Sequence, residues 1–192
     1  MRSSFWAGGS ELRWVVTGEW SRNRLLQVIV LLYAFYVGLL WVTNAALYFN
    51  KMSLAPSSVV AYYLGDAEQF TQPRTYQGLL EVSHFHLFAF GMLLLVMTHL
   101  MLFVPLSGRA KAWLISVPFF AGILDEGASW LVRYGGESFA VVKVAGFLLL
   151  QGSLAVLIVV SVWSVFKGSQ ENFDDEDWDD ALDDEAPPLP DA

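Results

Sequence analysis

Cysteine is absent from the 192-residue sequence. Its absence excludes disulfide bonds, thiolate metal sites and cysteine nucleophiles. Histidine is scarce, since only three occur in the whole chain. The sequence also has no glycine-rich phosphate-binding loop, no recognisable hydrolase nucleophile motif and no basic cluster that indicates nucleic acid as a partner. Few side chains are left that could carry chemistry, which makes their positions informative.

Basic residues are missing from the end of the chain. Residues 168–192 contain eleven of the nineteen acidic residues and no Lys or Arg. The rest of the chain therefore has 11 basic and 8 acidic residues, a net charge of +3 against −8 for the whole sequence. This composition predicts a disordered acidic cytoplasmic tail over 167–192, in which residues 171–192 could bind a basic cytoplasmic partner.

Long hydrophobic runs are abundant, because 55% of the residues are hydrophobic and the mean hydropathy is +0.47. Four runs, at about 25–49, 79–105, 112–132 and 139–166, are long enough to cross ~30 Å of hydrocarbon as helices. A backbone in lipid must satisfy its own hydrogen bonds, which a helix does. We therefore predict an all-α membrane protein, a four-transmembrane-helix bundle within residues 25–166, with the lipid bilayer as its first partner.

The distribution of Lys and Arg predicts the orientation of this bundle. Seven of the eleven lie on the side of the two termini and four on the side of the 50–78 loop. The positive-inside rule then places both termini in the cytoplasm and makes 50–78 an outer loop. Residues 1–24 are expected to form a cytoplasmic amphipathic segment at the membrane surface. Within the outer loop, Pro56, Ser57 and Ser58 precede VVAYYL and Gly65, a pattern typical of a short capped helix with a glycine stop.

Ionisable residues inside the runs are costly in lipid, so each requires an explanation. They are Glu81, His84, His86 and His99 in the second run, Asp125 and Glu126 in the third, and Lys143 in the fourth. At 1.5 Å per residue, all except His99 fall in the outer leaflet. We expect these groups to meet inside the bundle near its outer end.

The helical angle of 100° per residue predicts which side chains share a face of the second run. His84 and His99 differ by about 60°, whereas His86 and His99 differ by about 140°. Glu81 and His84 are three residues apart and also share a face. We therefore predict that Glu81 and His84 face the bundle, and that His86 faces another helix, a subunit or lipid headgroups.

Several kinds of chemistry fit these residues. The pair His84 and His99 resembles the ligand helix of di-haem b-type membrane cytochromes, which implies haem b held by axial imidazoles. No other run contains a histidine, so each haem would need a ligand from another subunit, a methionine or an open axial position. A transition metal (Fe, Mn, Zn or Cu) bound by Glu81, His84, Asp125 and Glu126, with His86 as a further candidate ligand, is the second possibility.

Two further interpretations remain open. The polar group Glu81, Asp125, Glu126 and Lys143 could relay protons or hold a quinone headgroup, together with histidine, which titrates near neutral pH. Alternatively, Lys143 forms a buried interhelical ion pair with Asp125 or Glu126, no cofactor is bound, and the protein is a membrane scaffold or anchor that recruits partners through its acidic tail.

Residues 55–105, which include SVVAYYLGDAEQ and LLEVSHFHLFAFGMLLLVMTHL, resemble small histidine-containing bacterial inner-membrane proteins associated with respiratory cytochromes. The resemblance implies a multi-pass protein of a bacterial inner membrane. The resemblance carries no assigned activity. Together with the polar residues above, it favours a subunit of a redox complex that transfers electrons through haem or quinone, assembled with other membrane subunits or as a homo-oligomer.

Overall fold

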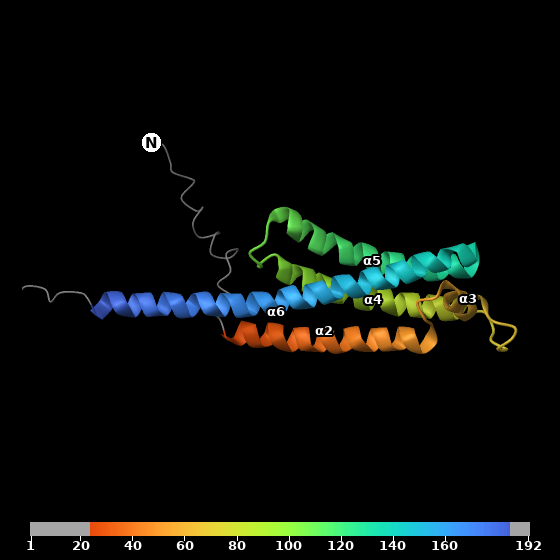
Figure 1. The fold of residues 1–192 in the computed structure, drawn as a ribbon, viewed down its shortest axis with the longest axis horizontal. Helices are drawn as coiled ribbons and strands as arrows, with labels where there is room; N and C mark the ends of the chain where they lie inside the picture. The colour runs from red at the N-terminus through yellow and green to blue at the C-terminus, as the bar shows by residue number, and fades with distance from the viewer. Residues whose placement is uncertain (1–23, 185–192) are drawn as a thin grey trace, which may run out of the picture.

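The computed structural model describes the chain over residues 24–184 and its side chains over 24–166. Its elements are α2 (Arg24–Lys51), α3 (Pro56–Leu64), α4 (Tyr76–Met101), α5 (Gly108–Gly135), η2 (Glu137–Phe139) and α6 (Ala140–Asp184). Four stretches are long and apolar enough to cross a membrane, which confirms the predicted all-α four-helix bundle. Figure 1 shows the four long helices side by side and α3 across one end. The predicted surface segment 1–24 lies outside the described residues, apart from Arg24.

The ends of the spans are set by local capping residues rather than by hydropathy alone. Thr75 precedes α4 and its side chain accepts a hydrogen bond from the Gly78 backbone N–H at 3.1 Å, so α4 begins before the apolar run. Ser107 caps α5 in the same way. The end of α4 at Met101 precedes Pro105, whose ring disfavours a helical conformation in the residue before it. Each hydropathy-based boundary therefore differs from the observed one by a few residues.

The short helix α3 in the loop between α2 and α4 was predicted from the sequence, but its cap differs. Pro56 itself occupies the first turn and Ala55 precedes it without a side-chain cap. The Ser58 hydroxyl instead accepts from the Ser53 backbone N–H at 2.9 Å. Gly65 ends the helix at φ +85°, where a Cβ would lie 2.7 Å from the Thr71 carbonyl oxygen, so this turn requires glycine.

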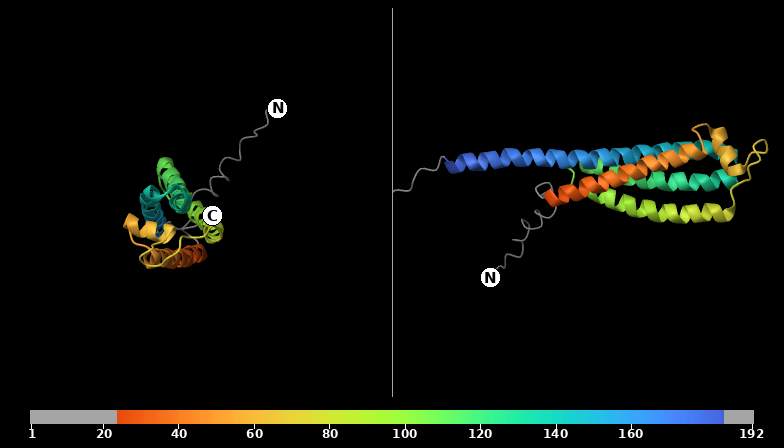
Figure 2. Two further views of the ribbon diagram at one scale, coloured as in Figure 1. Left: turned by 90° about the vertical axis from the view of Figure 1, so that its right-hand side faces the viewer. Right: turned by 90° about the horizontal axis from the view of Figure 1, so that it is seen from below.

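Helix α6 is the central element of the bundle, because it packs against α2, α3, α4 and α5. It extends well beyond the other helices at the end opposite α3 (Figure 2). The sequence predicts disorder from residue 167, whereas the helix continues to Asp184. No proline occurs between Ala140 and Asp184, so nothing in the backbone stops a helix that has already nucleated. Residues 185–192 of the predicted tail lie outside the described part.

The apolar core is divided into two clusters along the bundle. One cluster fills the half away from α3 and includes Val37, Leu94, Met97, Leu154 and Leu157, all buried. The other lies under α3 and joins α3 to all four long helices. The second cluster is not purely apolar, because buried polar and charged side chains lie beside it. These polar side chains form the candidate site.

Candidate functional site

The deepest part of the site is an ion pair between α5 and α6. Lys143 Nζ lies 2.7 Å from Asp125 Oδ1 and donates a second hydrogen bond to the Asp125 carbonyl oxygen at 3.0 Å. Both side chains are buried. The helices come this close because Gly146 has no side chain: a Cβ there would lie 2.9 Å from Asp125 Cα. Lys143 and Gly146 are three residues apart, so both lie on the face of α6 that meets Asp125.

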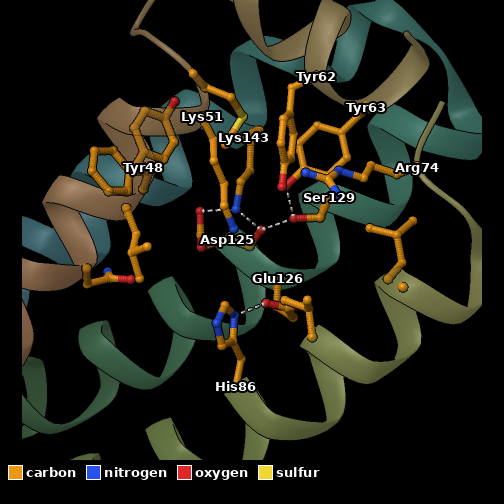
Figure 3. Close-up of a pocket in the computed structure, with 17 residues that line it drawn as sticks. Tyr48, Lys51, Tyr62, Tyr63, Arg74, His86, Asp125, Glu126, Ser129 and Lys143 are labelled. Carbon is orange, nitrogen blue, oxygen red and sulfur yellow. Dashed lines mark hydrogen bonds and ion pairs between the residues drawn. The ribbon is translucent and has the colours of Figure 1, made fainter. Parts of the chain in front are cut away.

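A second polar group joins α4 to α5 around Glu126. His86 Nδ1 lies 2.9 Å from Glu126 Oε2, and the Ser83 hydroxyl donates to Glu126 Oε1 at 2.5 Å. Trp130 Nε1 donates in turn to the Ser83 oxygen at 2.7 Å. Both oxygens of the Glu126 carboxyl group therefore have partners, as a buried carboxylate requires. Figure 3 shows the His86 ring pointing up to Glu126, which lies below Asp125.

Helix α3 contributes the Tyr63 hydroxyl, which pairs with the Ser129 hydroxyl of α5. The Tyr63 and Ser129 hydroxyl oxygens are 2.9 Å apart, and the Ser129 hydroxyl donates to the Asp125 carbonyl oxygen at 3.3 Å. Burial raises the pKa of the Tyr63 hydroxyl above its ordinary value of 10.0, so this group stays neutral at physiological pH. The short outer helix thus supplies a polar side chain to the site as well as covering it.

These groups surround a cavity of about 130 Å³ at the α3 end of the bundle. All four long helices and α3 contribute to its wall, including the four charged or titratable side chains just described. Aromatic rings complete it: Tyr48 and Phe147 stack with centroids 3.6 Å apart, and Tyr62 and Tyr63 lie on the α3 side. The cavity thus offers hydrogen-bonding groups on one wall and flat apolar surfaces on another.

The cavity reaches the side of the bundle between α2 and α4. Leu47 on α2 and Val82 on α4 both line it, and they are 57% and 45% exposed. Helix α2 packs mainly on α6, and helix α4 packs mainly on α5 and α6. The two helices therefore pack on these neighbours more than on each other. The His86 side chain is 43% exposed at the same place. The wall of the cavity between α2 and α4 thus contains partly exposed side chains.

The structure brings together only some of the residues that the sequence suggests. His86, Asp125, Glu126 and Lys143 meet at the α3 end of the bundle. Glu81 and His84 are exposed, and Glu81 accepts a hydrogen bond from Gln77 one turn earlier. The prediction that Glu81 and His84 face the bundle is therefore wrong. His86 faces another helix, α5, which is one of the alternatives that the sequence left open.

The reason lies in the buried stripe of α4. The buried residues of this stripe are separated by three or four residues or by sums of these steps, as expected for one face of a helix. They include Leu79, Ser83, Leu94 and Met97, and His86 lies on the same face. The predicted angle of about 60° between His84 and His99 agrees with their position on one side of α4. The angle does not predict whether that side of α4 faces the bundle or the surroundings. Ser83, the small polar residue at the start of the stripe, is the signal that could have identified the inner face.

The candidate haem and metal ligands are not gathered inside the chain. His84 and His99 are both exposed on α4. Among the described side chains, residues 24–166, no group of three or more His, Asp or Glu is arranged to hold a metal ion. Asp125 and Glu126 are separated from Glu81 and His84 by the α4 backbone, because the two pairs lie on opposite sides of it.

Several residues of the site were not singled out by the sequence. Ser83, Trp130, Tyr63 and Ser129 bond to the charged groups or to each other. Serine, tyrosine and tryptophan occur throughout membrane helices and their ends, so residue type alone does not distinguish them. Their contribution depends on how α3, α4 and α5 pack, which no local pattern reveals.

Comparison with known proteins gives one match. A family model for a transmembrane helical domain matches residues 53–172, which contain α3, α4, α5 and most of the apolar part of α6. No curated protein and no solved structure matches the chain. The match covers all the helices that contribute His86, Asp125, Glu126 and Lys143, whereas α2 lies before it.

Proposed function

The chain belongs to this family of transmembrane helical domains. From the geometry of its site, we propose that it binds a quinone headgroup in the α3-end cavity and exchanges protons with it. It does so as a multi-pass subunit of a redox complex in a bacterial inner membrane, with its termini in the cytoplasm. The observation that carries the proposal is a cavity beside the protonatable pair His86–Glu126 whose wall between α2 and α4 includes the partly exposed side chains of Leu47 and Val82. Membrane quinones reach their sites laterally because they are dissolved in the bilayer.

The size and lining of the cavity support a single-ring ligand. An engineered protein cavity of about 150 Å³ holds one benzene molecule, and the cavity here measures about 130 Å³. Stacked Tyr48 and Phe147 provide an aromatic surface for a flat ring. His86 and Glu126 provide polar groups to which quinone oxygens can hydrogen-bond. At the inner end, the apolar cluster that includes Leu94 and Leu157 closes the bundle.

The charges around the cavity support proton exchange. Asp125 and Glu126 contribute two negative charges, and Lys143 contributes one positive charge. His86 Nδ1 and Glu126 Oε2 lie 2.9 Å apart, close enough for this pair to exchange a proton with a ligand beside it. Reduction of a quinone to a quinol takes up two electrons and two protons. The partly exposed His86 is placed to pass protons between the outer surface and the ligand.

Electrons must reach the quinone from a partner, and the outer face of α4 favours a site for it. His84 and His99 lie exposed on one side of this helix, where polar side chains facing lipid are costly. Haem b held by these histidines, together with ligands from another subunit, would sit between the subunits. The test is the absorbance spectrum of the purified complex. We expect a Soret band that is weakened in His84→Ala, because the haem at His99 remains, and that is kept in His86→Ala; a colourless complex would contradict this assignment.

Quinone binding can be measured directly with the purified chain in phosphatidylcholine nanodiscs. Decylubiquinone should quench tryptophan fluorescence in a saturable way, because Trp130 is hydrogen-bonded within the site. Glu126→Gln and His86→Leu should each weaken binding by at least about tenfold. One charge-assisted hydrogen bond is worth about 1.5–3 kcal/mol, and 1.4 kcal/mol corresponds to a factor of ten.

The matched control is His99→Leu, the same substitution on the same helix near its opposite end. Because His99 is exposed and far along α4 from the cavity, its loss should leave decylubiquinone binding unchanged. Circular dichroism of each variant verifies that the helices are retained. Absence of saturable quenching in the wild type, or equal weakening by His99→Leu and His86→Leu, would refute quinone binding at this site.

A further inference from the structure

Two basic side chains at the mouth of the cavity have no acidic partner. Lys51 and Arg74 are exposed and line both the 130 Å³ cavity and a second, outer cavity of about 530 Å³ beside α3. The ion pairs within the described side chains, residues 24–166, are Lys143–Asp125 and His86–Glu126, and neither includes a cation of the mouth. The shared rim of the two cavities therefore carries two unbalanced positive charges.

Arg74 is held in a fixed position by the surrounding structure. Its backbone N–H donates to the Tyr63 carbonyl oxygen at 3.0 Å, and its own carbonyl oxygen accepts from Arg133 Nε at 2.7 Å. Its guanidinium group lies over the Tyr62 ring, 4.0 Å from the centroid. Stacking uses the flat face of a guanidinium and leaves the N–H groups at its edge free to bind an oxyanion. Figure 3 shows Arg74 extending over the tyrosines toward the cavity.

The acidic residue nearest this rim does not neutralise it. Asp66 lines the outer cavity, but its Oδ1 accepts hydrogen bonds from the backbone N–H groups of Glu68 at 2.8 Å and Gln69 at 3.3 Å. The Asp66 carboxylate therefore stabilises the turn that follows it. It lies beyond ion-pair distance of both Lys51 and Arg74. The rim remains a site that requires a negative charge from outside the chain.

The height of the two cations indicates where this charge comes from. Lys51 is the last residue of α2, and Arg74 stands just before the Thr75 cap of α4. Helix α2 has 28 residues, a length of about 42 Å against about 30 Å for the hydrocarbon layer. Its end therefore lies among the lipid headgroups, and exposed Leu47 one turn below lies among the acyl chains.

We propose that Lys51 and Arg74 together bind the phosphate group of an anionic phospholipid, whose headgroup covers the mouth of the cavity. The guanidinium edge of Arg74 binds two phosphate oxygens and the Lys51 ammonium group binds as a point charge. The lipid's acyl chains follow the exposed surface of α2 below Lys51. This site does not depend on the identity of the ligand in the inner cavity.

The test uses native mass spectrometry of the full chain released from nanodiscs that contain phosphatidylcholine and phosphatidylglycerol in equal amounts. We expect a retained phosphatidylglycerol adduct on the wild type. The double variant Lys51→Gln/Arg74→Gln should reduce the preference for phosphatidylglycerol over phosphatidylcholine by at least about tenfold. Both side chains are exposed, so the fold should tolerate the change. The matched control, Arg109→Gln/Lys111→Gln, removes two cations at the other end of the bundle and should keep the preference.

A second arm distinguishes a lipid from a soluble anion. Inorganic phosphate added to the nanodiscs before release should leave the phosphatidylglycerol adduct in place, because free phosphate has no acyl chains to anchor it. Displacement of the adduct by inorganic phosphate would overturn the assignment to a lipid. An unchanged lipid preference in the Lys51→Gln/Arg74→Gln variant, or an equal loss in the control variant, would overturn the site itself.

Discussion

Replacing Lys143 with methionine is expected to lower the free energy of unfolding by about 3–5 kcal/mol, because it leaves a buried carboxylate without its partner. Asp125 is buried and receives both hydrogen bonds that the Lys143 ammonium group donates to it. Methionine matches the length of the lysine stem, so lost packing contributes little to the effect. The measurement is an SDS titration of the purified protein, followed by far-ultraviolet circular dichroism.

The double variant Lys143→Met/Asp125→Leu separates the ion pair from packing. When both members of a buried pair become apolar, stability often returns to that of the parent or exceeds it. We expect the double variant to unfold at a higher SDS concentration than Lys143→Met alone. If the double variant is as unstable as the sum of the single ones, the two side chains do not act as a pair.

Adding one methyl group at Gly146 is expected to cost about 1–3 kcal/mol of unfolding free energy, the usual cost of overpacking a filled interior. The new Cβ would lie 2.9 Å from Asp125 Cα and 3.0 Å from Asp125 N. Both are backbone atoms, so α5 and α6 would have to move apart. The same movement would lengthen the Lys143–Asp125 contact, and Gly146→Ala should therefore also weaken decylubiquinone binding.

Gly152 provides the matched control on the same helix. No atom lies within 4 Å of a Cβ built at Gly152, so Gly152→Ala meets no obstruction. Alanine favours a helix over glycine by roughly 0.5–1 kcal/mol, and this variant should be as stable as the wild type or slightly more stable. Equal SDS midpoints for Gly146→Ala and Gly152→Ala would show that the close helix contact is not a constraint.

The sequence was sufficient to predict the fold because the bilayer imposes a simple rule. Four apolar runs must be four helices, and the depth of each ionisable residue follows from helix rise. That reasoning correctly placed Asp125, Glu126 and Lys143 at one height. Helix rise could not predict how α4 is rotated about its own axis, because apolar residues occur on all faces of this helix. The prediction that Glu81 and His84 face the bundle is therefore wrong.

Contacts between distant segments account for the remaining differences. Tyr63 reaches Ser129 only because α3 folds back over α5, and the loop that allows this depends on Gly65. Gly146 gives no signal in the sequence, since glycines are frequent in membrane helices, and its role emerges only from the distance to the α5 backbone. The extension of α6 to Asp184 was missed because a run of acidic residues was taken to indicate disorder.

Photoaffinity labelling with an azidoquinone most directly tests whether the cavity binds quinone. The wild-type protein in nanodiscs is irradiated, digested and mapped by mass spectrometry, with excess decylubiquinone as competitor. The account predicts competed labels on residues that line the opening between α2 and α4, such as Leu47 and Val82. Labels confined to the exposed surface of α4 between His84 and His99, or labels that decylubiquinone does not reduce, would contradict it.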